Sequence, residues 1–140
     1  MPGRTWSRAA AAGLAALWLS GCDPLTADEL TREIDQIHSL AAEGAVLADG
    51  VRADRTRATF TRVHARELAD SADESAQKLN DATEAPGLAD DVEGAIELAG
   101  DVSQALGDLE TSPGDEATGG DAAKRLRDLA DRADRLADGL

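Results

Sequence analysis

Two pairs of side chains in the sequence could together bind a metal ion. Asp35 and His38 are three residues apart, as are His64 and Glu67. In a hairpin that folds near residue 51, position 38 would lie opposite 64 and position 35 opposite 67. Neutral imidazoles with carboxylates suit Zn²⁺, Cu²⁺, Ni²⁺ or Fe²⁺. A half-buried histidine bonded to a carboxylate has the same pattern, so we expect no cofactor and keep the metal site as the alternative.

No other residue pattern in the sequence indicates a reaction. The chain has no nucleophile-elbow motif, no Gly-rich phosphate loop with its lysine, no HExxH zinc motif and no acidic calcium loop. The glycines are scattered without any of these spacings. We therefore expect a protein that is not an enzyme.

The beginning of the chain has the pattern of a secretory signal peptide. Arg4 and Arg8 precede residues 9–19, a run of eleven residues without a polar side chain. A positive start followed by a short apolar run is typical of an exported protein. The run is too short for a transmembrane helix, which needs about 20 apolar residues.

The apolar run ends in Leu19, Ser20, Gly21 and Cys22, which resemble the lipobox of bacterial lipoproteins. The resemblance implies that residues 1–21 form a signal helix that is removed, and that Cys22 carries the lipid, including acyl chains such as palmitate. Residues 22–28 would then be a lipidated tether, which places the protein on the extracytoplasmic face of the cell membrane. Cys22 is the only cysteine, so no intramolecular disulfide can form.

The composition excludes several classes of partner. The chain has 28 acidic and 14 basic residues, a formal charge of −14. Without residues 1–21 the ratio is 28 acidic to 12 basic residues, a charge of −16. Such a charge repels phosphate backbones, so we expect no nucleic acid partner. Phe60 is the only aromatic residue after Trp18, and the low aliphatic content lies near the border of intrinsic disorder.

The spacing of apolar residues favours helices over disorder. Four segments have heptad-like apolar stripes rich in Ala and Leu, at about 28–51, 56–83, 88–109 and 122–140. Phe60 and Val63 begin the stripe of the second segment. We expect an all-α fold over residues 29–140, an antiparallel bundle of about four helices with coiled-coil-like packing and a loop at 111–120. The first turn is weakly marked, so the first two segments could instead form one long rod.

Basic residues gather in two places that the bundle would bring to one end, opposite the lipid. Two interpretations remain open. These residues either neutralise neighbouring acids or form a patch that docks a partner or an anionic surface. The residues are Arg52, Arg55, Arg57, Arg62, Arg66, Lys124, Arg125 and Arg127.

These patterns favour a lipoprotein that works through protein contacts. We expect a non-enzymatic helical module, held at the membrane by the lipid on Cys22, with an unidentified protein of the cell envelope as its partner. The alternative is a metal-binding or metal-sensing envelope lipoprotein that uses the two histidines.

Overall fold

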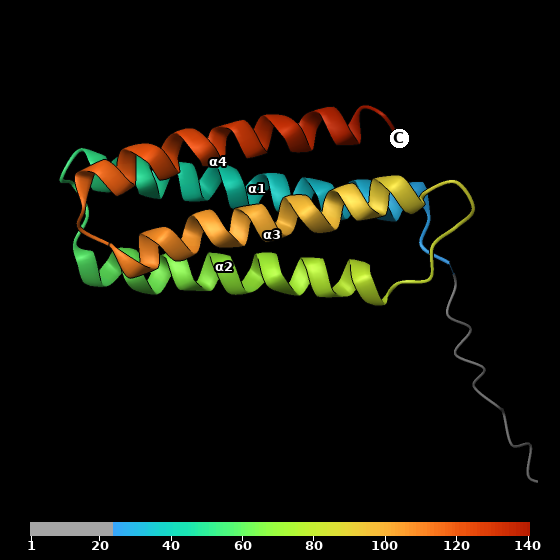
Figure 1. Cartoon of the computed structure of the whole chain (residues 1–140), viewed down its shortest axis with the longest axis horizontal. Helices are drawn as coiled ribbons and strands as arrows, with labels where there is room; N and C mark the ends of the chain where they lie inside the picture. Colours follow the sequence, from blue (N-terminus) through green and yellow to red (C-terminus); the bar gives the residue numbers. More distant parts are fainter. Residues whose placement is uncertain (1–23) are drawn as a thin grey trace, which may run out of the picture.

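Residues 24–140, the part of the chain that the computed structural model describes, form an antiparallel four-helix bundle (Figure 1). The helices are α1 (Ala27–Arg52), α2 (Ala58–Asp81), α3 (Ala89–Thr111) and α4 (Glu116–Ala137). The predicted fold class is thus confirmed, and the first two segments form a hairpin rather than a rod. The predicted signal helix and the lipobox with Cys22 lie outside the described residues.

The bundle has two ends that differ in what they hold. At the end that we call proximal, α1 begins and the connection from α2 to α3 crosses (Figure 1). At the distal end lie the α1–α2 and α3–α4 turns. No helix within residues 24–140 is long and apolar enough to cross a membrane.

The helices begin where polar side chains cap them. Thr26 and Glu29 form a capping box at α1, in which the Glu29 carboxylate accepts from the Thr26 backbone N–H at 2.9 Å. At α4, the Asp115 carboxylate accepts from the Thr118 backbone N–H at 2.7 Å. This cap makes the predicted loop at 111–120 too long. Only residues 112–115 connect α3 to α4, and Gly119 and Gly120, which suggested a longer loop, are helical.

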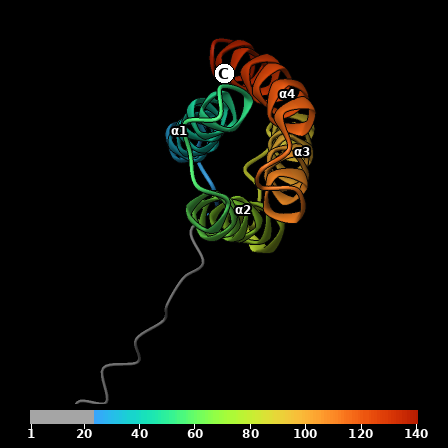
Figure 2. The ribbon, with the colours of Figure 1, turned by 90° about the vertical axis from the view of Figure 1, so that its left-hand side faces the viewer.

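The core is built from Ala and Leu on all four helices. α1 packs most extensively against α4, and α2 against α3. Figure 2 looks along the helices from the distal end and shows these two pairs. Small residues allow the helices to pack closely. A β-carbon on Gly44 of α1 would lie 2.7 Å from Leu106 Cδ2 and 3.1 Å from Leu126 Cδ1. The seam between α1 and α2 has fewer contacts than either pair.

The chain just before α1 is fixed to the proximal end. The backbone N–H of Leu25 donates to the carbonyl of Thr83 at 2.7 Å, and Leu25 and Glu84 form an isolated β-bridge. The Leu25 side chain also packs against the core. Pro24, two residues after Cys22, therefore lies next to the α2–α3 connection.

Candidate functional site

The structure separates the two histidines that could have shared a metal ion. His38 Nε2 lies 3.5 Å from Asp134 Oδ1 on α4. His64 Nε2 lies 2.8 Å from Glu43 Oε1 on α1, and His64 Nδ1 lies 3.6 Å from Glu67 Oε2. His64 and Glu67 are therefore together, whereas His38 faces another helix. Within residues 24–140 no group of three or more His, Cys, Asp or Glu residues is placed to hold a metal.

The register of the α1–α2 hairpin explains this separation. The contact between Glu43 and His64 centres the hairpin between positions 53 and 54, not at 51. His38 is then level with residue 69 rather than with residue 64. Because α1 packs mainly on α4, the His38 ring meets Asp134 of that helix, and Asp35 remains exposed on α1.

Half of the predicted basic patch is paired with acids. Arg52 Nη2 lies 3.2 Å from Asp49 Oδ1, and Arg127 also bonds to Asp49. Arg66 Nε donates to Glu110 Oε1 at 2.8 Å, and Arg125 Nη2 lies 3.5 Å from Asp101 Oδ1. The hydrogen bond that Arg66 donates to Glu110 raises the pKa of Arg66. The neutralising interpretation thus holds for these four basic residues.

The other half of the basic patch makes no such contact. Among the described residues, Arg55, Arg57, Arg62 and Lys124 have no carboxylate within 4.0 Å. All four are exposed. The distal end therefore has a smaller set of unpaired cations than the sequence indicated.

Exposed apolar side chains lie at the start of α2, near Arg57 and Arg62. Phe60 is 56% exposed and Val63 is 53% exposed, although the sequence placed both in the apolar stripe of the second helix. That placement was wrong because Thr61, Ala65 and Leu68 turn inward and fix the buried face of α2. Thr61 occupies the core position that the sequence pattern assigned to Phe60. Because threonine is polar, the pattern of apolar residues did not indicate which face of α2 is buried.

The exposed residues of α2 are linked to α1 by His64. The rings of Phe60 and His64 stack with centroids 5.4 Å apart and an interplanar angle of 27°. His64 bonds to Glu43 of α1. Val46 lies one turn further toward the distal end and is 73% exposed. Val46 borders a groove with Arg127 and Ala130 of α4, so it lies on the α1–α4 side of the bundle and not in the seam with Phe60.

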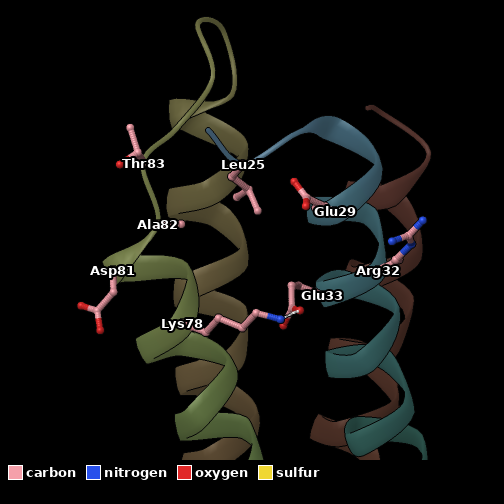
Figure 3. Close-up of a pocket in the computed structure, with 8 residues that line it drawn as sticks. All are labelled: Leu25, Glu29, Arg32, Glu33, Lys78, Asp81, Ala82 and Thr83. Carbon is pink, nitrogen blue, oxygen red and sulfur yellow. Dashed lines mark hydrogen bonds and ion pairs between the residues drawn. The ribbon is translucent and has the colours of Figure 1, made fainter. Parts of the chain in front are cut away.

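A cleft of about 420 Å³ opens in the same seam at the proximal end (Figure 3). Lys78 reaches across from α2 to the Glu33 carboxylate on α1, whereas Arg32 points away from Lys78. Glu29 is engaged in the α1 cap, where hydrogen bonds from Thr26 lower its pKa. Glu29, Glu33 and Lys78 thus have structural partners, and among the described residues no nucleophile with an adjacent base lies in the cleft. The lining residues are Leu25, Glu29, Arg32, Glu33, Lys78, Asp81, Ala82 and Thr83.

The fold defines the described chain as a four-helix bundle with an Ala-rich core. Comparisons with protein-family models, with curated proteins and with solved structures found no match.

Proposed function

We propose that this chain is a lipoprotein anchored through Cys22 that acts as a non-enzymatic interaction module in the cell envelope. One observation carries the proposal. Phe60, the only Phe, Tyr or Trp among residues 24–140, is exposed at the distal end of the bundle, away from Pro24. Aromatic residues and arginines are enriched at protein interfaces, and large apolar side chains left in water are costly. The exposed Phe60 ring does not contribute to the core. Contact with another protein therefore explains its position better.

The position of Pro24 supports a membrane-facing proximal end. Cys22 and Pro24 are separated only by Asp23, and the hydrogen bond from Leu25 to Thr83 fixes the next residue against the α2–α3 connection. With 26 residues, α1 is about 39 Å long at 1.5 Å per residue. A bundle standing on its tether would therefore present the α1–α2 and α3–α4 turns well beyond the roughly 8 Å range of headgroup charge.

Acyl labelling and fractionation test the anchor. Cells producing the full precursor are fed an alkyne analogue of palmitate, and wild type is compared with Cys22→Ala. We expect label and membrane partition in wild type and loss of both in the variant. A soluble, unlabelled wild-type chain would contradict the proposal.

Because Cys22 is the only cysteine, an introduced cysteine can test on which side of the membrane the bundle lies. Val63→Cys adds a thiol on the exposed face of α2, while lipidated Cys22 offers none. A membrane-impermeant maleimide should label Val63→Cys on spheroplasts without lysis. Labelling that requires lysis would contradict an extracytoplasmic location.

A further inference from the structure

We propose that the distal face, defined as Phe60 and Val63 with Arg55, Arg57 and Arg62, docks a partner protein whose surface combines an apolar recess with carboxylates. The inference rests on the proposed function and specifies the kind of partner.

The apolar part of the distal face is concentrated. Of the four large apolar side chains exposed in residues 24–140, two, Phe60 and Val63, lie one turn apart on α2. At 100° per residue, Val63 points directly away from the buried stripe of α2, and Phe60 is about 60° from Val63 around the helix. The stacking of Phe60 on His64 holds the phenyl ring toward the α1 side. The two side chains thus form one outward-facing group about one turn deep.

The charged part of the distal face favours anions. Arg55, Arg57 and Arg62 are exposed and have no carboxylate within 4.0 Å among the described residues. The helix beside them adds to this preference. The first turn of α2 contains no acid, and no side chain caps it. A free helix N-terminus carries partial positive charge, so partner carboxylates would meet both this terminus and the guanidinium groups.

A bilayer fits this face less well than a protein does. Between Glu67 and Asp81, α2 carries five acids and one lysine. Laying the α1–α2 side on a membrane would press these acids against anionic headgroups. A compact protein contact at the distal end avoids that repulsion.

A second copy also fits poorly. Two copies anchored in the same membrane stand parallel, so their distal faces would bring arginines opposite arginines. Like charges facing each other across an interface repel and disfavour association. An acidic partner of a different sequence has the complementary charge.

Site-specific photocrosslinking in intact cells tests the proposal. Benzoylphenylalanine replaces residue 60 of the full chain and, as a control, residue 128, which is exposed on α4. We expect a protein adduct from position 60 at least tenfold more abundant than from position 128. Mass spectrometry of the crosslinked peptide should place it in a segment with excess Asp and Glu around an apolar residue.

Charge reversal separates electrostatic complementarity from mere proximity. Arg55→Glu combined with Arg57→Glu should reduce the position-60 adduct at least tenfold. The matched control, Arg32→Glu with Arg135→Glu, changes the net charge equally at exposed sites elsewhere and should leave the adduct unchanged. These side chains are exposed, so all variants should keep the wild-type melting temperature.

Each remaining outcome overturns the docking inference. These are no adduct at position 60, equal adducts from both positions, a neutral or basic partner segment, crosslinks only to lipid, or crosslinks between two copies. A dominant protein adduct from position 128 would leave the interaction module standing and reject only this face. An absence of acyl labelling in wild type would instead contradict the lipid anchor on Cys22.

Discussion

Gly119 of α4 lies directly against the backbone of Arg52 in α1. A β-carbon on Gly119 would be 2.7 Å from the Arg52 backbone nitrogen and 3.0 Å from the Ala48 carbonyl oxygen. Both neighbours are backbone atoms, which cannot rotate aside as a flexible side chain can. The α1–α4 pair therefore depends on the absence of a side chain at this position.

Gly119→Ala should destabilise the bundle even though alanine favours helices. Overpacking of a close contact costs roughly 1–3 kcal/mol, which exceeds the propensity gain of about 0.5–1 kcal/mol from removing a helical glycine. Urea unfolding of the unlipidated mature chain, residues 22–140 with Cys22→Ser, measures the change.

Gly100→Ala is the matched control in α3. Its β-carbon would meet no atom within 4 Å, so only the propensity gain remains. We expect the two substitutions to change stability in opposite directions. A stabilising Gly119→Ala would show that α4 can move away from α1 at little cost.

The sequence predicted the four helices because heptad spacing records which side chains must be buried together. It predicted that α4 begins after residue 120 rather than at Glu116, because Gly119 and Gly120 resemble loop residues. Their role depends on how closely α1 and α4 approach, and that distance is a property of the packed pair. The histidine pairing failed for a related reason, since hairpin register depends on the turn geometry around Asp54, whose φ is 48°.

The unpaired half of the basic patch could not be identified from the sequence either. Arg62 and Arg66 have the same charge and lie one turn apart on α2. Only Arg66 finds a carboxylate, Glu110, on the neighbouring α3. The exposure of Phe60 had one available clue, since a face through Thr61, Ala65, Leu68 and Ala72 has regular helical spacing.

We expect Zn²⁺, Ni²⁺ and Cu²⁺ to bind no more tightly than to ordinary exposed His and carboxylate pairs. His38 and His64 face different helices, so one ion cannot use both rings in this fold. Calorimetric titration of the unlipidated chain should give affinities weaker than about 1 μM, and melting should not shift with metal.

A His38→Ala, His64→Ala double variant completes that test. A true site would add stability by mass action only where the ligands are present. Submicromolar binding that is lost in the double variant, with a metal-dependent rise in melting temperature restricted to wild type, would make the metal-binding alternative primary.

The Asp115 cap should make α4 sensitive to acid. Hydrogen bonds from the Thr118 hydroxyl and backbone N–H lower the pKa of Asp115. A lowered folded-state pKa contributes stability that is present above the unfolded value, about 3.9, and is lost as pH falls through the folded value. Asp115→Asn keeps a capping side chain but cannot titrate.

The stability difference between wild type and Asp115→Asn should therefore be constant from pH 7 to about 5 and then shift against wild type below about pH 4. Urea unfolding across this range measures it. A pH-independent difference would show that the carboxylate is not held by Thr118 in solution.

Thr61 is a polar residue that the core does not satisfy. Its side chain is fully buried, and within the described chain its Oγ1 has no hydrogen-bond partner. A buried hydroxyl without a partner costs roughly 1–3 kcal/mol relative to water. Thr61→Val replaces the hydroxyl by a methyl group of similar shape and keeps β-branching. We expect it to stabilise the unlipidated mature chain by about 1 kcal/mol in urea unfolding.

Thr61→Ser separates the two halves of the side chain. It keeps the unsatisfied hydroxyl and removes the buried methyl group, so it should destabilise the chain by about 1 kcal/mol. The order Val above Thr above Ser would show that Thr61 contributes through its methyl group alone. If Val were the least stable of the three, the hydroxyl must bond to water or backbone in solution, and the inward face of α2 would be wetter than its alanine neighbours indicate.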